Sequence, residues 1–256
     1  MPTREQLIIA GPCAAESERQ VMTAAEQLAK LGIIVIRLSL HKPRTGPGFD
    51  GVHDAGIPWL AKVTQELGLT VATEVLCVKD AIDLLAVFEI NPQANVWPWL
   101  GSRNQNHQIQ QGVARLVRDR YPSSTKLILK NQPWPDPLHW AGMARHAQAG
   151  GLSSQQLILC HRGFHPNGHN PNGWRNVPDH QMAMQVSHDL QLQMIFDASH
   201  VGGRPEAVIA AAKEAKAYAY AGYMIEVHPD PTNALTDARQ QLTVEQFAHD
   251  LLPFIQ

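Results

Sequence analysis

Four side chains that can bind a divalent metal stand at or after the ends of short apolar segments. Cys13 ends the segment LIIAGPC, and His200 ends MIFDASH. Glu226 lies in YMIEVH, and Asp237 follows it in ALTDARQ. A thiol, an imidazole and two carboxylates form a donor set that disfavours Mg²⁺ and suits Mn²⁺, Fe²⁺, Co²⁺ or Zn²⁺. Structural alternatives stay open, because a cysteine is often a small buried apolar residue and His200 could cap a helix.

Six cationic side chains form a second group at the ends of similar apolar segments. They are Arg37, Lys42, Arg44, Arg103, Lys130 and Arg162. The whole chain carries 21 Lys and Arg against 23 Asp and Glu, so this group does not reflect a generally basic protein. Because like charges repel when they are gathered together, the group indicates a dianionic ligand or two, with phosphates and a carboxylate as the best match. The alternative is that single members form ion pairs with Glu74, Asp50 or Asp54.

The composition narrows the class of protein. A formal net charge of -2 gives no general attraction for nucleic acid or anionic lipid, so neither is expected as a partner. The three cysteines favour reduced thiols over a disulfide scaffold, with Cys77 and Cys160 as buried apolar positions. No segment approaches the roughly 18 apolar residues of a membrane span, and the N-terminal residues do not form a secretory leader. These features predict a cytoplasmic location.

Eight short apolar segments rich in Val, Ile and Leu recur about every 30 residues, which is the length of a βα unit. The intervening residues have helical periodicity; within 17–32, for example, Val21, Ala24 and Leu28 share one face. Eight strands that alternate with eight helices predict an α/β fold, a (β/α)8 TIM barrel formed by residues 1–256 as a single domain. The predicted strands span residues 7–13, 33–39, 69–75, 95–101, 126–131, 157–163, 194–200 and 223–228.

A barrel of this kind would bring the two groups of side chains together. The carboxyl ends of its strands meet at one mouth, so residues that are far apart in sequence become neighbours there. Two long connections rich in Gly, Pro and Asn, residues 41–56 and 165–177, are expected on the same face. Pro98 lacks an N–H and is uncommon inside a sheet, so a bulge is expected within 95–101.

Three histidines at a spacing of four residues, His161, His165 and His169, could indicate a second metal site. The glycines and the proline between them would break the helix that is needed to align the three rings. The sequence therefore predicts a solvated loop at these histidines.

Seven motifs occur in order, each at the end of its own predicted strand. They are GPC-x-x-E-S, KPRT, GSRN, LILK, C-x-R-G, DASH and EVHPDP-x-x-ALTD. On these motifs the chain resembles the type I 3-deoxy-D-arabino-heptulosonate 7-phosphate (DAHP) synthases over about residues 7–242. The resemblance implies a metal-dependent transferase, with Mn²⁺ as the first choice of metal. The implied reaction condenses phosphoenolpyruvate with erythrose 4-phosphate, the first step of the shikimate pathway to chorismate and the aromatic amino acids, and a homo-oligomer, dimer or tetramer, is expected.

The resemblance also implies a role for each matching residue. The implied metal ligands are Cys13, His200, Glu226 and Asp237. The implied phosphoenolpyruvate site consists of Arg37, Lys42, Arg103, Lys130 and Arg162. The aldose phosphate would meet Arg44 and Thr45, with Asp197 near its sugar end. Catalytic roles fall to Lys42, Cys13 and His200, with Lys42 or a metal-bound water as the proton donor.

Two positions depart from the pattern of many family members. The segment Cys160-His161-Arg162-Gly163 has His161 where those members have Glu, and Lys130 is followed by Asn131-Gln132-Pro133 in place of Arg-Gly. Both changes resemble the branch in which the synthase is fused to a chorismate mutase. Since the barrel accounts for almost every residue, a mutase is expected only as a separate partner.

Two other functions stay open. The related 3-deoxy-octulosonate 8-phosphate synthases use arabinose 5-phosphate, but they have an Asn-rich stretch where this chain has Pro43-Arg44-Thr45. The second alternative is a catalytically silent barrel that binds sugar phosphates or serves as a scaffold. Such a protein would have no physical need for metal ligands and phosphate-binding cations together.

Overall fold

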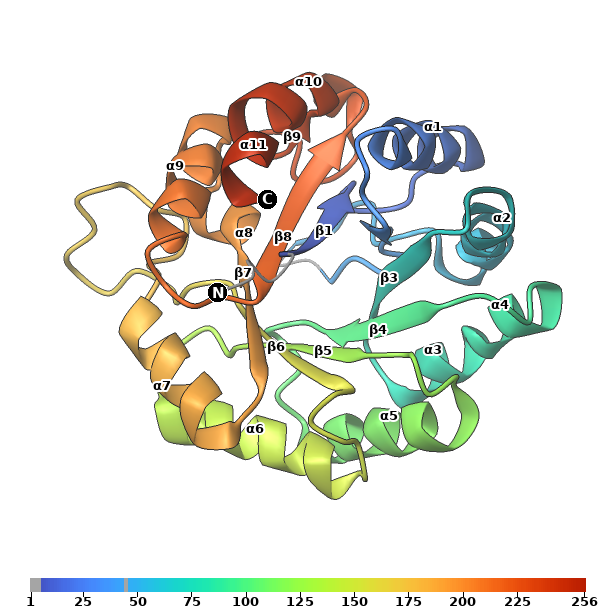
Figure 1. The fold of residues 1–256 in the computed structure, drawn as a ribbon, viewed down its shortest axis with the longest axis horizontal. Coiled ribbons are helices and arrows are strands. Elements are labelled where there is room, and N and C mark those ends of the chain that lie inside the picture. The colour runs from blue at the N-terminus through green and yellow to red at the C-terminus, as the bar shows by residue number, and fades with distance from the viewer. Residues whose placement is uncertain (1–5, 44–45) are drawn as a thin grey trace.

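A closed barrel of parallel strands forms the centre of the molecule in the computed structural model, which describes residues 6–43 and 46–256 (Figure 1). The strands follow one another in chain order, and β1 also pairs with β8, which closes the ring. They are β1 (Leu7–Gly11), β2 (Val35–Arg37), β3 (Thr70–Val75), β4 (Val96–Leu100), β5 (Leu127–Lys130), β6 (Leu157–His161), β7 (Gln193–Asp197) and β8 (Gly222–His228). A short strand, β9 (Leu242–Thr243), extends the pairing of β8. The predicted TIM barrel is confirmed.

Helices cover the outside of this ring (Figure 1). The main ones are α1 (Glu18–Ala29), α2 (Ile57–Leu67), α3 (Val78–Asp83), α4 (Leu85–Ile90), α5 (His107–Arg120), α6 (Pro137–Ala149), α7 (His180–Leu190), α8 (Ala198–Gly202) and α9 (Pro205–Ala215). The C-terminal helical segment consists of α10 (Val244–Gln246), a π-helical turn (Phe247–Leu251) and α11 (Leu252–Ile255). Polar side chains begin several helices; Ser17, for example, accepts a hydrogen bond from the N–H of Gln20 at 3.2 Å.

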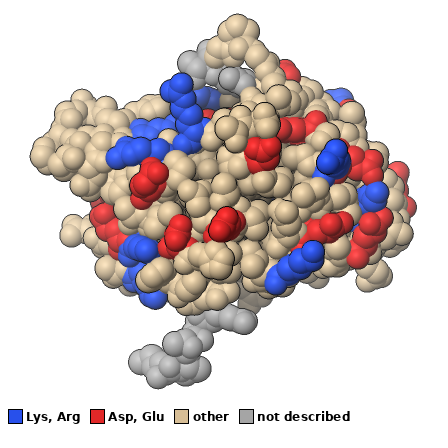
Figure 2. Space-filling view, turned by 90° about the horizontal axis from the view of Figure 1, so that it is seen from above, with Lys and Arg blue, Asp and Glu red and all other residues tan. Residues whose placement is uncertain are grey.

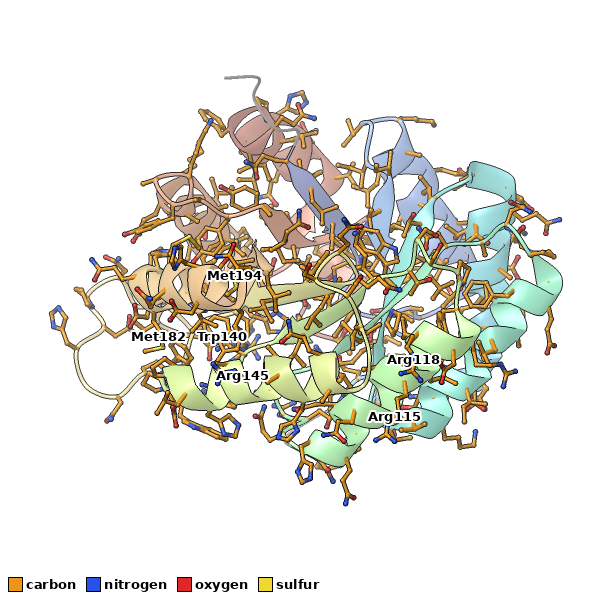
Figure 3. The ribbon with its side chains drawn as sticks, turned by 60° about the horizontal axis from the view of Figure 1, so that its bottom comes forward. Arg115, Arg118, Trp140, Arg145, Met182 and Met194 are labelled. Atoms are coloured by element: carbon orange, nitrogen blue, oxygen red, sulfur yellow. The ribbon has the colours of Figure 1, made fainter. Side chains whose placement is uncertain are left out.

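The core has two layers. The outer layer lies between strands and helices, where Trp140 of α6 and Met194 of β7 are both buried (Figure 3). The inner layer fills the barrel with side chains from all eight of its strands. Its members are Ile9, Val35, Ala72, Trp97, Trp99, Ile128, Ile158, Cys160, Ile195 and Met224. Burying a large apolar side chain stabilises a fold by roughly 1.5–3 kcal/mol, so the inner layer makes the barrel a packed core and not a pore.

Strand β4 contains Pro98 but no bulge. Residues 71–75 of β3 pair one to one with residues 96–100 of β4, and Thr73 lies opposite Pro98. The pairing of β4 with β5 begins only at Trp99. Pro98 comes before the first paired residue, so this pairing does not need the N–H that proline lacks. The predicted bulge is therefore wrong.

Gly11 allows the chain to bend into the mouth of the barrel at the end of β1. Its φ of 148° is one that residues with a side chain rarely adopt, and a Cβ there would lie 2.4 Å from the carbonyl oxygen of Arg37. The carbonyl oxygens of the next two residues, Pro12 and Cys13, each accept a hydrogen bond from the Arg37 guanidinium at 3.3 Å. This close approach positions the Cys13 thiol.

Basic and acidic side chains intermingle over the outer face seen in Figure 2, as the small net charge leads one to expect. Over the part of the chain that the structure describes, helices with the length and apolar character of a membrane crossing are absent.

Candidate active site

A ring of polar side chains lies directly above the apolar interior, at the carboxyl ends of the strands. Along a strand, every second side chain points to the same face. Two residues beyond the inward-facing Val35 comes Arg37, and two beyond Ile128 comes Lys130. The same step leads to Glu74 on β3, Arg162 after β6, Asp197 on β7 and Glu226 on β8. The inward-facing side chains are thus apolar below this level of the barrel and charged at it. The charged level forms the site.

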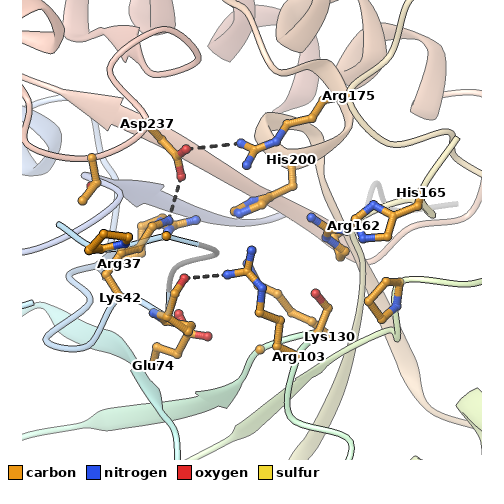
Figure 4. Close-up of a pocket in the computed structure, with 17 residues that line it drawn as sticks. Arg37, Lys42, Glu74, Arg103, Lys130, Arg162, His165, Arg175, His200 and Asp237 are labelled. Carbon is orange, nitrogen blue, oxygen red and sulfur yellow. Dashed lines mark hydrogen bonds and ion pairs between the residues drawn. The ribbon is translucent and has the colours of Figure 1, made fainter. Parts of the chain in front are cut away.

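A cavity of about 340 Å³ opens at this mouth (Figure 4). Five of the six predicted cations line it, namely Arg37, Lys42, Arg103, Lys130 and Arg162. The sixth, Arg44, and the predicted aldose-binding Thr45 lie outside the described residues. Arg103 reaches across to the β2 loop, where it donates a hydrogen bond to the carbonyl oxygen of Pro43 at 2.6 Å.

Three of the four predicted metal ligands meet beside the cavity. Atoms of Cys13, Glu226 and Asp237 that can ligate a metal all lie within 4.8 Å of one another. Asp237 has a φ of 46°, a backbone conformation that costs free energy outside glycine and that recurs at functional sites. His200 lies next to this group and not within it: its Nδ1 is 3.9 Å from Glu226 Oε1 and 2.9 Å from Asp197 Oδ2.

The group suits a divalent cation. Lys42 places its ammonium nitrogen 2.8 Å from Cys13 Sγ and 2.7 Å from Asp237 Oδ2, so positive charge already sits between two of the three residues. Glu226 Oε1 is buried without a well-aligned hydrogen bond, although the Arg37 guanidinium lies 3.1 Å away. One sulfur and two carboxylates with an imidazole nearby are ligands for Mn²⁺, Fe²⁺, Co²⁺ or Zn²⁺. The residues present therefore fit such a metal.

Burial and charge together set the protonation of this group. Burial and the nearby Glu226 raise the pKa of the Cys13 thiol to about 12, so a metal would have to displace a proton from it. Burial would also raise the pKa of Asp237, but the charge of Lys42 outweighs it and holds that pKa well below its usual range. Burial lowers the pKa of Lys42, but the acidic groups of Cys13, Glu226 and Asp237 outweigh it and raise that pKa above the usual value.

Buried carboxylates pair with two of the cavity cations. Lys130 Nζ lies 2.7 Å from Asp197 Oδ2, and Arg37 Nη2 lies 3.1 Å from Glu226 Oε1. These partners differ from the expected alternatives, Glu74, Asp50 and Asp54. Despite the desolvation of its carboxyl, Asp197 keeps a pKa well below its usual range because His200 and Lys130 are close. Each of these two cations therefore lines the cavity and also contacts one buried carboxylate.

Among the residues that the structure describes, none provides Arg162 with a carboxylate partner of this kind. Its Nη1 donates a hydrogen bond to Asn176 Oδ1 at 2.9 Å, and Asn176 in turn donates to the carbonyl oxygen of His200. Burial lowers the pKa of Arg162 to about 10, which still leaves it protonated at neutral pH. A buried, protonated guanidinium with an amide partner is suited to bind an anion.

The sequence analysis missed Arg175, which also lines the cavity (Figure 4). Its Nη1 lies 3.3 Å from Asp237 Oδ1 and donates a hydrogen bond to Gln240 Oε1, while Gln240 donates to Glu226 Oε2. Arg175 comes from the loop after β6, which was predicted on this face. The presence of a basic residue in that loop was the only available signal.

The three histidines at a spacing of four do not lie in one loop. His161 ends β6 and is fully buried, where its Nε2 accepts a hydrogen bond from the N–H of Asp179 at 3.1 Å. His165 and His169 are exposed, and His165 lines the cavity. The predicted solvated loop is wrong for His161, because His161 is the last residue of β6 and its ring is buried.

Comparisons with known proteins agree with this geometry. The sequence profile of the DAHP synthetase I family matches residues 3–118 and 122–254. The chain belongs to this family. Members of the DAHP synthetase I family use phosphoenolpyruvate and a sugar phosphate.

Similar members of the family carry two different names. The chain is 30% identical over 241 residues to phospho-2-dehydro-3-deoxyheptonate aldolase of Thermotoga maritima, covering 94% of this chain and 66% of that protein. It is 29% identical over 266 residues to 2-dehydro-3-deoxyphosphooctonate aldolase of Alkalilimnicola ehrlichii, covering 95% of this chain and 87% of that protein. The chain thus spans just under two thirds of the length of the Thermotoga relative, and the two names imply different sugars.

The fold agrees with solved members of the family. The crystal structure of the Thermotoga maritima DAHP synthase matches with a TM-score of 0.82 and 29% identity, over 96% of this chain and 67% of that chain. A truncated form of the Thermotoga enzyme matches with a TM-score of 0.79 and 28% identity, over 96% of this chain and 84% of that form. The barrel therefore corresponds to the part of the Thermotoga enzyme that the truncated form largely retains.

Proposed function

We propose that this chain catalyses the metal-dependent condensation of phosphoenolpyruvate with erythrose 4-phosphate, giving DAHP and inorganic phosphate. The observation that carries the proposal is the meeting of two groups at one mouth: cations that line the cavity, and the Cys13, Glu226 and Asp237 group beside it. A binding protein for one phosphate would need the cations alone. The metal ligands are explained by a reaction in which an aldehyde must be activated.

The cations solve the first physical problem of this reaction, which is to bring two anionic phosphates together. Arg37, Lys130 and Arg162 lie on the cavity wall and would hold the phosphate and carboxylate of phosphoenolpyruvate. Arg44 and Thr45 would hold the phosphate of the aldose, and Asp197 would lie near its sugar end. Fixing both substrates in one orientation accounts for several kcal/mol of the barrier, on the order of the 7–11 that well-oriented reactions gain.

Cys13, Glu226 and Asp237, with His200 beside them, would hold the metal. When bound, a divalent metal supplies Lewis acidity that makes the aldehyde carbon electrophilic. C3 of phosphoenolpyruvate then attacks that carbon, water adds at C2, and the hemiketal phosphate loses inorganic phosphate. Lys42 keeps its proton at neutral pH because of the acidic groups around it, and it would donate that proton to the new alkoxide oxygen.

A second candidate has a specific observation in its favour. The Alkalilimnicola relative is named for a phosphooctonate product, which indicates an aldose one carbon longer. Pro43-Arg44-Thr45 favours the four-carbon aldose on the family resemblance. The two departures at His161 and at Asn131-Gln132-Pro133 resemble the branch in which the synthase is fused to a chorismate mutase, so a chorismate mutase is the partner that we propose.

A product assay with both aldoses tests the proposal. Purified protein is incubated with phosphoenolpyruvate and either erythrose 4-phosphate or arabinose 5-phosphate, with Mn²⁺ or with a chelator. We expect a larger kcat/KM for erythrose 4-phosphate and no turnover with the chelator. A preference for arabinose 5-phosphate would establish the second candidate, and phosphoenolpyruvate binding by calorimetry without turnover of either sugar would establish the silent barrel. Gel filtration with a purified chorismate mutase tests the proposed partner.

A further inference from the structure

Trp99 lies at the top of the apolar interior, directly below the ring of charged residues. Its side chain is only 1% exposed and belongs to the inner layer of the core. Gly101, which directly follows β4, takes the next inward-facing position and has no side chain. A Cβ at Gly101 would lie 2.0 Å from Glu74 Oε1, so a larger residue there would have to displace the Glu74 carboxylate. The indole of Trp99 is therefore left as the uppermost side chain of its strand.

Two cavity cations lie over the indole ring of Trp99. The guanidinium carbon of Arg37 is 5.2 Å from the ring centroid, and the ammonium nitrogen of Lys130 is 5.4 Å from it. Both distances fall within the roughly 6 Å over which the electron-rich face of an aromatic ring attracts a cation. Arg37 and Lys130 come from β2 and β5, so one ring contacts cations from two separate strands.

The ring does something that a carboxylate could not do in this place. Arg37 and Lys130 already have one buried carboxylate each, in Glu226 and Asp197. Glu74 already lines the same cavity, and a further carboxylate would neutralise more of its wall and weaken its attraction for an anion. An aromatic face stabilises both cations while it adds no negative charge, so their charges stay available to a ligand.

The polar end of the indole does not explain why Trp99 is there. Its Nε1 is buried and has no hydrogen-bond acceptor among the described residues. Burying an unpaired donor costs free energy, so a phenylalanine or leucine would fill the interior without that cost. The face of the indole ring is the part of Trp99 that has partners, namely Arg37 and Lys130.

Trp97 makes a matched comparison, because it is two residues earlier on the same strand and faces the same interior. It is 6% exposed, and its Nε1 donates to Asn95 Oδ1 at 3.2 Å. The cation over its ring, Lys126, is 5.8 Å from the centroid and does not line the cavity. Trp97 therefore shares the size, burial and cation contact of Trp99 but not the connection to the site.

We propose that Trp99 is a positioning residue for the anion site, a buried aromatic platform that holds Arg37 and Lys130 in place for phosphoenolpyruvate. This inference rests on the proposed function, since it takes phosphoenolpyruvate as the ligand of those two cations. Trp99 itself does not line the cavity and acts only through Arg37 and Lys130. Its removal should weaken phosphoenolpyruvate binding and leave metal binding unchanged.

Fluorinated tryptophans test this platform without changing its shape. Mono-, di- and trifluorinated tryptophan are incorporated at position 99 by nonsense suppression, and phosphoenolpyruvate binding is measured by calorimetry in the presence of Mn²⁺. Each fluorine withdraws electrons from the ring face, so we expect the Kd to rise in steps, reaching about 5- to 30-fold for the trifluorinated ring. The same series at position 97 is the control and should leave the Kd unchanged. Mn²⁺ affinity, measured separately, should stay constant in both series.

Two substitutions complete the test. Trp99→Phe keeps a smaller ring face and should raise the KM for phosphoenolpyruvate less than Trp99→Leu does, while the KM for the aldose stays the same. If native protein binds phosphoenolpyruvate but the Kd is flat across the fluorinated series at position 99, the platform is overturned and the proposed function stands. If native protein does not bind phosphoenolpyruvate, the proposed function and the platform are both overturned.

Discussion

The ammonium nitrogen of Lys42 lies 2.8 Å from the sulfur of Cys13, at the boundary between the two groups of site residues. Lys42 belongs by sequence to the cations that line the cavity, and Cys13 belongs to the metal ligands. The same ammonium is 2.7 Å from Asp237 Oδ2. A substitution of Cys13 therefore changes the surroundings of Lys42 as well, and metal binding must be measured separately from activity.

Cys13→Ser is expected to abolish most of the metal affinity. Loss of a residue that hydrogen-bonds to a metal ligand lowers metal affinity by about 10- to 100-fold. Replacement of the ligand itself should therefore lower metal affinity by at least about 100-fold. Equilibrium dialysis with Mn²⁺ measures this directly, and activity in chelator-treated buffer should fall to background for native protein as well. Cys77→Ser is the control, because Cys77 is only partly buried, against expectation, and it caps α3 without lining the cavity or joining the metal group. Full turnover of native protein in metal-free buffer would contradict the metal assignment.

Arg103→Ala is expected to raise the KM for phosphoenolpyruvate far more than the KM for the aldose. Hydrogen bonds to charged groups contribute about 1.5–3 kcal/mol, which corresponds to a rise of roughly 10- to 100-fold. Steady-state kinetics with each substrate varied in turn measures the two effects. Arg145→Ala, on the exposed face of α6, is the matched control and should change neither KM (Figure 3). Equal rises for both substrates would count against the assignment of Arg103.

Residues at the ends of strands could be placed from the sequence, because a closed barrel brings all carboxyl ends to one mouth. This convergence correctly brought Arg37, Lys130 and Arg162 to one cavity, and the period-two alternation explains why they point inward. The same reasoning brought Cys13 next to Glu226, although 213 positions separate them in the chain. Strand geometry is common to every barrel, so it can be inferred without homologous sequences.

Loop residues could not be placed in this way. The path of a loop depends on its own turns and contacts, so no periodicity indicated that Arg175 would reach Asp237 or that Gln240 would reach Glu226. Side-chain rotation sets a second limit. The ring of His200 turns towards Asp197, which is why this histidine lies beside the three-residue metal group instead of inside it.

His161 is expected to make the protein sensitive to acid. Burial, with His180 and Arg162 nearby, lowers its pKa to about 3, whereas an unfolded histidine titrates near pH 6.5. Between these values the unfolded chain binds a proton that the folded chain does not, so stability falls as pH falls. From pH 7 to pH 5 this residue alone should remove about 2 kcal/mol from the free energy of unfolding.

Urea unfolding at a series of pH values measures this effect. His161→Gln should reduce the loss of stability between pH 7 and pH 5, whatever its effect on stability at pH 7. His188→Gln is the control, because His188 is 80% exposed on α7 and should leave the dependence on pH unchanged. If native protein and His161→Gln lose equal free energy of unfolding between pH 7 and pH 5, His161 is not the cause of the acid sensitivity.

Asp197→Asn is expected to destabilise the barrel by about 3 kcal/mol or more, because it leaves the buried Lys130 ammonium without its carboxylate. Asparagine has nearly the same shape and can still accept the backbone hydrogen bond of His200, which spans 3.1 Å to Asp197 Oδ1. The variant therefore removes the negative charge of Asp197 and leaves the packing at this position nearly unchanged. Asp189→Asn on the exposed face of α7 is the control, and exposed pairs contribute at most about 1 kcal/mol. Urea unfolding at pH 7 measures both variants, and equal, small losses would mean that Lys130 finds another partner at the cavity wall.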